Sequence, residues 1–448
     1  MVNVEEIKHY VNKIFSDFGV NRKQEIIRLL FEISKKENKK IDDIIKDAPI
    51  QDRQFLPLKQ YLMKRRFPNL IAQEKKVNFS LPELDINPKY RINIRKKFQI
   101  IPRHFYIEKS VLGTALAKRL KTKFPDAQFT TITRYKEFVG KKKWGIEDYN
   151  HRAEQFFVVK EGFDFFKKCP CSIKSVSCGY HVINLGSGCA FECTYCYLQD
   201  YINSPGIVIP ANIEDFFRHF EYYKQDIRLG SGELTDSLLF DHITEFSPLI
   251  VDFFRKYPRS TFEFKTKSNN IDLLLSVKSA GNIVVAWSIN PQRIIETTEF
   301  YTASLEERLQ AAEQCARAGY KVAFHFDPII YCQNWETDYH DLVNEIFTRI
   351  DDRQMAWLSL GTLRMTPRLK KIIENRFPEN KILDEEFIPA YDGKMRYSHQ
   401  IRSNIYKKMK EWIKSRSPNV YFYLCMEEKL MCQENQTPPL RAYDKVPV

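Results

Sequence analysis

The sequence predicts an α/β protein, a partial TIM barrel with a (β/α)6 core and a helical N-terminal region. Three observations lead to this fold class. Residues 1 to about 75 carry apolar side chains at helical spacing and contain no cysteine. From Tyr180 onward, short apolar strands alternate with longer helices, which is typical of strand–helix units around a parallel sheet. A polar side chain or a cysteine motif follows each of these strands.

The chain has 448 residues, which is more than one average domain. We predict a helical accessory region with a basic linker at 1–95, a segment leading into the core at 96–175, the partial barrel at 176–425 and a C-terminal tail at 426–448. The stretch from about residue 77 to 103, which spans the linker and the start of the next segment, is rich in prolines and basic residues, namely Pro82, Pro88, Arg91, Arg95, Lys96, Lys97 and Arg103. It is either a phosphate-contacting face or a solvated surface run.

Composition indicates a globular protein without a membrane span. The hydrophobic fraction is 43%, and no run of eighteen apolar residues occurs. The N-terminal residues form an amphipathic helical pattern without the features of a secretory signal peptide, so we expect a cytoplasmic protein. Lys and Arg total 70 against 57 for Asp and Glu, and this net charge of +13 favours a polyanionic partner such as nucleic acid.

Six strands make up the predicted barrel, at residues 181–185, 226–229, 261–266, 283–289, 321–326 and 355–363. We expect a helix after each of them, and the fourth is the best marked. Ser304 and Glu307 form a capping box at its start, and Gly319 stands where the chain leaves it. Active sites of such barrels lie at the carboxyl ends of the strands. We therefore expect one pocket, faced by the cysteine motif, Glu233, Lys267, Asn290, Asp327 and Arg364.

The cysteine motif is C-x3-C-x2-C, at Cys189, Cys193 and Cys196 in NLGSGCAFECTYCYLQDY. Thiolates are suited to iron, and three of them on a short loop leave one iron of a 4Fe-4S cluster open to another ligand. The motif resembles that of radical S-adenosylmethionine enzymes, in which the cofactor chelates this iron and is cleaved to a 5′-deoxyadenosyl radical. The alternatives are a zinc knuckle and three ordinary buried cysteines.

Two further groups of cysteines have no diagnostic spacing. Cys169, Cys171 and Cys178 form C-x-C-x6-C a little upstream, and Cys425 and Cys432 lie near the C-terminus. For each group there are two interpretations, a site for a second metal or cluster and a redox-inactive role.

The segment LGSGELTDS predicts a cofactor contact after the second strand. Gly230 and Gly232 let backbone approach a ligand closely, and Glu233 would accept a hydrogen bond from the cofactor ammonium. The pattern resembles the GGE segment of radical S-adenosylmethionine enzymes, although a simple turn is the alternative. Lys267 and Ser288, at the ends of the third and fourth strands, would bind the cofactor carboxylate or ribose, or else lie at the core edge.

Residues 105–423 resemble the spore photoproduct lyase family. The segments that carry the resemblance are HFYIEKSVLGTALAKRL, CTYCYLQDY, FKTKSNNIDLLL, AWSIN, SLEERLQAAEQCARAGYKVAFHFDPII and DGKMRYSHQIR. The resemblance implies an enzyme that reverts a methylene-bridged thymine dimer in DNA. The deoxyadenosyl radical takes a hydrogen from C6 of the reduced thymine, the bridge fragments, and a hydrogen returns to the product radical.

The resemblance also implies residue roles. Tyr195 and Tyr197 match two tyrosines that take part in the return of hydrogen, with packing aromatics as the alternative, and Arg396 and Tyr397 fall in the segment that approaches the lesion. In the family a cysteine donates the hydrogen, and here its position holds Glu233, whose O–H bond is too strong for that role. Cys332 after the fifth strand, or a tyrosine, is the substitute that we expect if the reaction is the same.

The partners implied are DNA and an electron donor such as a flavodoxin or ferredoxin, and we expect a monomer. Glu233 and the additional N-terminal region favour an alternative, a radical enzyme of the same build that modifies RNA, a protein or a small molecule. A third reading is an iron–sulfur binding module without catalysis.

Overall fold

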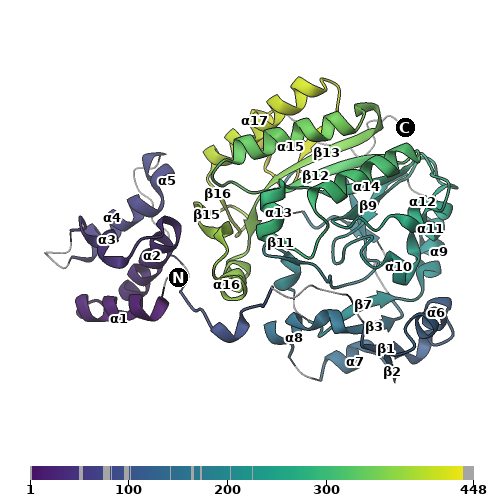
Figure 1. Ribbon diagram of the computed structural model, residues 1–448, viewed down its shortest axis with the longest axis horizontal. Coiled ribbons are helices and arrows are strands. Elements are labelled where there is room, and N and C mark those ends of the chain that lie inside the picture. Colours follow the sequence, from purple (N-terminus) through teal and green to yellow (C-terminus); the bar gives the residue numbers. More distant parts are fainter. Residues whose placement is uncertain are drawn as a thin grey trace. The chain divides into compact units, whose positions relative to one another are not determined.

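The computed structural model describes residues 3–49, 54–73, 81, 83–94, 100, 102–141, 143–162, 166–171, 174–201, 203–223 and 226–436. The chain forms two compact units, a smaller one from residues 1–92 and 363–402 and a larger one from residues 93–362 and 403–448 (Figure 1). The smaller unit therefore contains a segment that lies late in the sequence, inside the range predicted for the barrel. Arg95, Lys96, Lys97 and Pro82 of the predicted linker fall outside the described residues.

The smaller unit begins with helices, as the apolar spacing predicts. They are α1 (Val4–Ile14), α2 (Val20–Glu37), α3 (Ile41–Ile45), α4 (Phe55–Arg66), α5 (Pro68–Gln73) and the 3-10 turn η1 (Pro88–Tyr90). Asn3 caps α1, since its side chain accepts from the amides of Glu5 and Glu6. The apolar stripe of α2 is fully buried at Ile26 and Leu30.

The late segment of the smaller unit adds β14 (Arg364–Met365), α16 (Pro367–Arg376), η6 (Lys381–Leu383), β15 (Phe387–Pro389) and β16 (Met395–Tyr397). The strands form an antiparallel sheet in the order β14-β16-β15. Buried ion pairs join α16 to α2, because Arg28 lies 2.5 Å from Glu374 and Lys370 lies 2.9 Å from Glu32.

The larger unit contains a four-stranded parallel sheet in the order β2-β1-β3-β7. Its strands are β1 (His104–Glu108), β2 (Gln128–Ile132), β3 (Gln155–Val159) and β7 (Ile207–Pro210). The elements between them are η2 (Lys109–Val111), α6 (Ala115–Lys123), α7 (Tyr135–Val139), α8 (Ile146–Asn150) and η3 (Arg152–Glu154). Phe105 stacks on Phe129 across β1 and β2, with ring centroids 5.1 Å apart.

The second sheet of the larger unit has eight strands in the order β17-β13-β12-β10-β9-β8-β5-β4 and curls into an open partial barrel. Its parallel strands are β5 (His181–Ile183), β8 (Arg228–Ser231), β9 (Thr261–Thr266), β10 (Ile283–Ser288), β12 (Lys321–Ile329), β13 (Met355–Thr362) and β17 (Phe422–Leu424). The edge strand β4 (Phe166–Lys168) pairs antiparallel with β5.

Helices cover the outside of this sheet. They are α9 (Ile213–Tyr223), α10 (Asp241–Thr244), α11 (Phe246–Phe254), α12 (Asp272–Leu275), α13 (Gln292–Thr298), α14 (Leu305–Arg317), α15 (Trp335–Arg349), α17 (His399–Arg416) and α18 (Lys429–Glu434). Figure 1 shows α14 and α15 running along β12 and β13. None of the described helices is long and apolar enough to cross a membrane.

The six predicted strands are all present, in the predicted order. The third, β9, has the predicted bounds, and the second begins two residues later than predicted, at Arg228. The capping box of α14 is also confirmed, since the Glu307 amide donates to Ser304 Oγ at 3.2 Å and the Ser304 amide donates to Glu307 Oε2 at 2.7 Å. Gly319 leaves that helix with a φ of +87°, which favours glycine.

Candidate cluster and cofactor site

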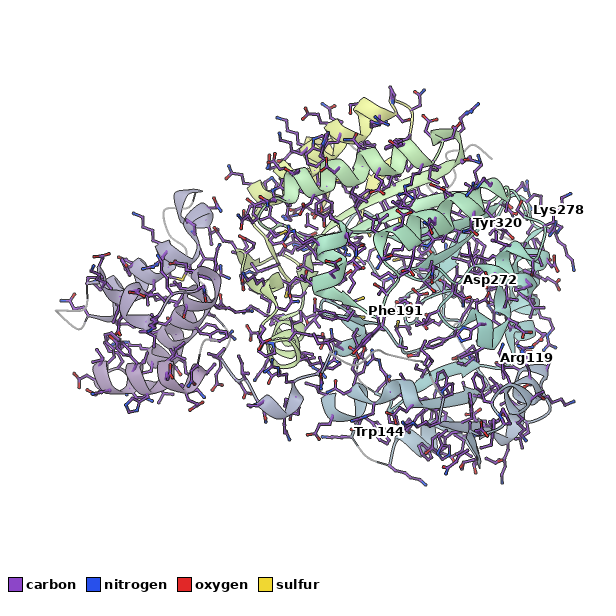
Figure 2. All side chains as sticks on the ribbon, in the orientation of Figure 1. Arg119, Trp144, Phe191, Asp272, Lys278 and Tyr320 are labelled. Atoms are coloured by element: carbon purple, nitrogen blue, oxygen red, sulfur yellow. The ribbon has the colours of Figure 1, made fainter. Side chains whose placement is uncertain are left out.

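The three motif cysteines lie on one loop after β5, which we call the cluster loop (residues 186–199). Cys189 and Cys193 are buried and Cys196 is half-buried. Residues Glu192–Cys193 form a short strand, β6, that pairs antiparallel with β11 (Glu299–Phe300). The loop then ends in the 3-10 turn η4 (Tyr197–Gln199). Phe191, labelled in Figure 2, marks its position in the larger unit.

Arg152 binds the backbone of the first half of the cluster loop. Its buried guanidinium donates to the carbonyls of Cys189 at 2.6 Å and Phe191 at 2.7 Å, and pairs with the Glu192 carboxylate at 2.5 Å. Glu192 is buried as well, so each charge satisfies the other. Sequence reasoning missed Arg152, because it lies 37 residues before Cys189 in an unremarkable helical turn.

Gln199 holds the second half. Its side-chain amide nitrogen lies 3.2 Å from the Cys193 carbonyl, 3.0 Å from the Thr194 carbonyl and 3.2 Å from the Cys196 carbonyl, and donates to them. One side chain thus binds three backbone carbonyls between Cys193 and Cys196. The loop is preshaped by hydrogen bonds that do not involve the sulfur atoms.

The thiols of the cluster loop suit iron by donor type and surroundings. Burial raises the pKa of Cys189 to about 12 and that of Cys193 well above its usual range, and each is affected by Cys196. Among the described residues, no three His, Cys, Asp or Glu side chains are drawn together closely enough to hold a metal ion as they stand. The fit of the loop to an iron–sulfur cluster therefore rests on its three neighbouring thiols and on its buried backbone, which hydrogen bonds hold in place.

The loop after β8 lies against the cluster loop, because the Gly188 amide donates to the Leu234 carbonyl at 2.8 Å. Gly232 has a φ of +102°, and a Cβ there would stand 2.9 Å from the Lys265 carbonyl oxygen, so only glycine fits without strain. Glu233 Oε2 is buried with no hydrogen-bond partner among the described residues, although Lys167 Nζ stands 3.9 Å away. Burial raises the pKa of this carboxyl.

An unpaired buried carboxylate oxygen fits the ammonium of an amino-acid cofactor such as S-adenosylmethionine, because it lacks the hydrogen bond that such a donor supplies. Gly230 lets Tyr180 and Glu263 pack closely against β8, since a Cβ there would lie 2.1 Å from the Tyr180 hydroxyl and 2.4 Å from the Glu263 carbonyl oxygen. Ser288 is buried at the end of β10, and its carbonyl accepts from Arg308 at 2.9 Å.

Lys267 follows β9 and lies beside the cluster loop. Its ammonium stands 5.6 Å from the centre of the Tyr195 ring. Burial lowers the pKa of Lys267, but Cys193 and Glu299 raise it more, so the net pKa is raised. Its amide donates to Asp236 Oδ2 at 2.7 Å, and Asp236 also accepts from Thr266 Oγ1 at 2.7 Å. Asp236 thereby joins the loops after β8 and β9.

Glu299 is the second residue that sequence reasoning missed. It is buried, accepts from the Tyr195 hydroxyl and from Asn290 Nδ2 at 2.8 Å, and forms an ion pair with Arg308 at 2.7 Å. Its partner β6 carries Cys193, so this network reaches the cluster loop directly. No local motif marks Glu299, because its partners come from three separate segments.

A family model for spore photoproduct lyase matches residues 100–423, which is well over half of the chain. The chain belongs to the spore photoproduct lyase family. The cysteine triad, the loop after β8 and Lys267 all lie inside the matched range. The resemblance that the sequence motifs indicated is confirmed, over a range that begins five residues earlier than the 105–423 predicted.

Curated relatives in this family come from three bacteria. Spore photoproduct lyase of Bacillus subtilis (strain 168) is 27% identical over 301 residues, which is 64% of this chain and 85% of that protein. The lyase of Geobacillus sp. (strain Y412MC61) is 31% identical over 46% of this chain and 63% of its own length. The chain thus spans a little under two thirds of the Geobacillus relative, and 61% of a Clostridium acetobutylicum relative.

Solved structures of spore photoproduct lyase have the same fold. One is complexed with dinucleoside spore photoproduct, and another is a variant with bound AdoMet and the same dinucleoside. Each is 25% identical, has a TM-score of 0.63 and covers 72% of this chain and 99% of that chain. The partial-barrel fold class predicted from the sequence is confirmed.

Other predicted residues are distributed around the lyase fold. Cys332 is half-buried after β12, where Arg293 Nη2 lies 3.4 Å from its sulfur. Tyr197 begins η4, directly after Cys196. Asp327 lies within β12 rather than after it, because that strand continues to Ile329. A hollow of about 600 Å³ lies by β1 and β2, and none of the predicted site residues is among the residues described as lining it.

Arg364, Arg396 and Tyr397 belong to the smaller unit. Arg396 is buried and pairs with Asp392 at 2.6 Å, and the buried Tyr397 packs on Phe387 with ring centroids 4.6 Å apart. The role of Arg396 and Tyr397 in substrate binding, and the place of Arg364 at the pocket, stay predictions.

Proposed function

We propose that this chain is a radical S-adenosylmethionine lyase that reverts the methylene-bridged thymine dimer of DNA to two thymines. The observation that carries the proposal is the cluster loop, in which Cys193 and Cys196 lie near Lys267 and the backbone before Cys189 contacts the loop of Glu233. Membership of the spore photoproduct lyase family supports the reaction and the substrate.

Cys189, Cys193 and Cys196 would hold a 4Fe-4S cluster, and Glu233, Lys267 and Ser288 would hold S-adenosylmethionine. Bound together, the two groups supply a 5′-deoxyadenosyl radical that removes hydrogen from C6 of the lesion. Lys267 would neutralise negative charge beside Cys193, and Glu233 would accept from the cofactor ammonium. An electron donor such as flavodoxin or ferredoxin would serve a monomeric cytoplasmic enzyme.

Hydrogen return requires a donor other than Glu233, which stands where the family has a cysteine. Tyr195, in the cluster loop, and Tyr197, which begins the turn η4, are the tyrosine candidates for this role. Cys332 is the thiol candidate, and its sulfur is already within reach of a cation, Arg293. A thiol gives a hydrogen atom more easily than a phenol, so Cys332 is the first variant to make.

The test is an anaerobic assay of the full chain. The cluster is reconstituted, S-adenosylmethionine, reductant and synthetic spore photoproduct dinucleotide are added, and thymidylyl-thymidine and 5′-deoxyadenosine are quantified by chromatography. We expect both products, with less thymidylyl-thymidine from Cys332→Ala. Formation of 5′-deoxyadenosine without repair would keep the radical chemistry and reject the substrate.

Glu233 favours one second candidate, a radical enzyme of the same build that modifies RNA, a protein or a small molecule. DNA binding separates the two proposals. A lesion-repair enzyme neutralises phosphates with basic side chains, so its affinity for DNA falls steeply with salt. A DNA affinity that is weak at low salt and flat with added salt would favour the second candidate.

A further inference from the structure

Four cysteines outside the cluster loop come together in the larger unit. Cys169, Cys171 and Cys178 precede β5, and Cys425 directly follows β17. The sequence separates Cys425 from the first three by 247 residues, which is why its spacing pairs it with Cys432 instead. The fold reverses that grouping.

The four cysteines lie in the segments that follow the two edge strands of the partial barrel. The edge strands of the eight-stranded sheet are β4 and β17. Ser175 and Glu428 form an antiparallel bridge across these edges, and the Val176 amide donates to the Glu427 carbonyl at 2.8 Å. Cys178 lies three residues after Ser175 and Cys425 three residues before Glu428, so this bridge brings together the two segments that carry these cysteines.

Side-chain packing agrees with this placement. Cys178 and Cys425 both pack against the buried cluster that contains Trp357 and Tyr423. The Cys425 amide is anchored to the Leu360 carbonyl at 2.7 Å, so the end of β17 is fixed on β13. The two thiols therefore share one half-buried position at the seam between the edges.

Cys169 and Cys171 reach the same position from β4. The Cys169 amide donates to the Tyr180 carbonyl at 2.8 Å, and the Cys171 amide donates to the Cys169 carbonyl at 2.7 Å, which turns the chain back. The Cys169 side chain hydrogen-bonds with the Cys171 thiol and lies near Cys425 and Cys178.

A buried cation stands beside this group. Arg228 lies over the rings of Trp357 at 3.8 Å and Tyr180 at 4.9 Å, and its Nη2 lies 3.3 Å from the Glu263 carboxylate and donates to the Tyr423 hydroxyl at 3.0 Å. Its Nε and Nη1 are buried with no hydrogen-bond partner in the part of the chain that the structure describes. Such a guanidinium offsets the charge of nearby thiolates.

We propose that Cys169, Cys171, Cys178 and Cys425 bind one Zn²⁺ ion as a tetrahedral tetrathiolate that fastens the two edges of the partial barrel. Four thiolates are a closed ligand set for structural zinc, and zinc binding releases the four thiol protons. With Zn–S bonds of about 2.3 Å, neighbouring sulfurs stand about 3.8 Å apart, which suits thiols that already hydrogen-bond.

Among the described residues, the side chains of these four cysteines are not arranged closely enough to coordinate a metal ion. The same is true of Cys189, Cys193 and Cys196 in the cluster loop. Binding would require rotation about the Cα–Cβ bonds in both places. The inference is independent of the proposed reaction, because the four cysteines share no residue with the cluster loop.

The test is the metal content of the full chain after anaerobic purification from cells supplied with zinc. We expect one zinc per chain in the wild type, and loss of zinc but not of cluster iron in Cys178→Ser and Cys425→Ser. Cys332→Ser is the matched control, because it also removes a half-buried thiol, and it should keep its zinc. Cys178→His should restore zinc, since imidazole is a zinc ligand.

A second measurement covers serine variants that fail to fold. In the chain with Cys189, Cys193 and Cys196 all replaced by alanine, added Co²⁺ should give the visible absorption of a tetrahedral cobalt thiolate at one ion per chain. Absence of that absorption would overturn the proposal. So would a wild-type chain without zinc, zinc retained when Cys178 and Cys425 are both replaced, or iron bound at these cysteines in place of zinc.

Discussion

Glu299 controls the protonation of the residues around it. Burial raises its pKa, but Arg308 and Lys267 lower it more, so the carboxyl is held ionised. Burial and the same carboxylate raise the pKa of Tyr195 well above its usual range. Tyr195 therefore keeps its hydroxyl hydrogen at neutral pH, which is the state that a hydrogen-atom relay needs.

Replacing Tyr195 with phenylalanine tests this role. We expect Tyr195→Phe to lower the ratio of thymidylyl-thymidine to 5′-deoxyadenosine several-fold, because radical formation continues while hydrogen return is slowed. The lost hydrogen bond to the ionised Glu299 should cost about 1.5–3 kcal/mol of unfolding free energy. Tyr201→Phe is the control, since Tyr201 is exposed in the same segment. An unchanged product ratio would assign Tyr195 to packing alone.

Glu233, which we propose binds the cofactor, destabilises the folded chain when its carboxyl is ionised. Its pKa is raised in the folded chain by burial, so the folded state holds the proton more tightly than the unfolded state. The contribution of Glu233 to stability is therefore most favourable below the unfolded pKa of about 4.3 and becomes less favourable as pH rises through the folded pKa.

Glu233→Gln should accordingly be more stable than the wild type at pH 7 in urea denaturation, with the difference vanishing at about pH 4. The same variant should bind S-adenosylmethionine at least about tenfold more weakly, because it loses a charge-assisted hydrogen bond. Isothermal titration measures the affinity. Glu296→Gln, at an exposed carboxylate on α13, should change neither quantity. Equal cofactor affinity in Glu233→Gln and wild type would remove Glu233 from the cofactor site.

At the scale of elements, the cluster loop owes its shape to neighbours rather than to its own sequence. Arg152 precedes β3, and β11 follows α13, so two distant segments fix the backbone that carries Cys189 and Cys193. A loop held in this way presents its sulfurs without depending on the metal for its fold.

Arg152→Met tests that support. Removing the guanidinium leaves Glu192 as a buried, unpaired carboxylate, and breaking such a pair costs about 3–5 kcal/mol. We expect a lower urea midpoint and a lower iron content after reconstitution, measured by colorimetric iron analysis. Arg255→Met is the control, because its ion pair with Asp252 is exposed and contributes about 0–1 kcal/mol. Full iron loading in Arg152→Met would show that the loop forms without this anchor.

At the scale of the whole molecule, the smaller unit has its own buried charge network. Arg28, Arg66 and Lys370 surround Glu32, and together they lower its pKa although burial alone would raise it. A depressed carboxyl pKa stabilises the fold above the unfolded value of about 4.3 and ceases to do so as pH falls through the folded pKa.

Glu32→Gln should therefore destabilise the smaller unit by about 3–5 kcal/mol at pH 7, because the buried Arg66 loses its carboxylate partner while Arg28 and Lys370 then share Glu374. All five tryptophans lie in the larger unit, at Trp144, Trp287, Trp335, Trp357 and Trp412. Far-UV circular dichroism should show an earlier unfolding step in the variant, while tryptophan fluorescence is unchanged. Glu5→Gln, at an exposed ion pair, is the control. Coincident shifts in both signals would show that the units unfold together.

The sequence by itself determined the features that are contiguous in the chain. The strand at Thr261–Thr266, the capping box of α14 and the cysteine triad each depend on residues close together, so periodicity and spacing reveal them. The same local segments carried the family resemblance.

Only the tertiary structure decided which distant residues meet. Glu299 at the cluster loop, Cys425 beside Cys178, and α16 against α2 are contacts between segments separated by about a hundred residues or more. No local pattern records them, because a buried charge or thiol is set by what the fold places around it. For that reason the sequence located the cysteines that would carry the cluster but not the residues that hold them.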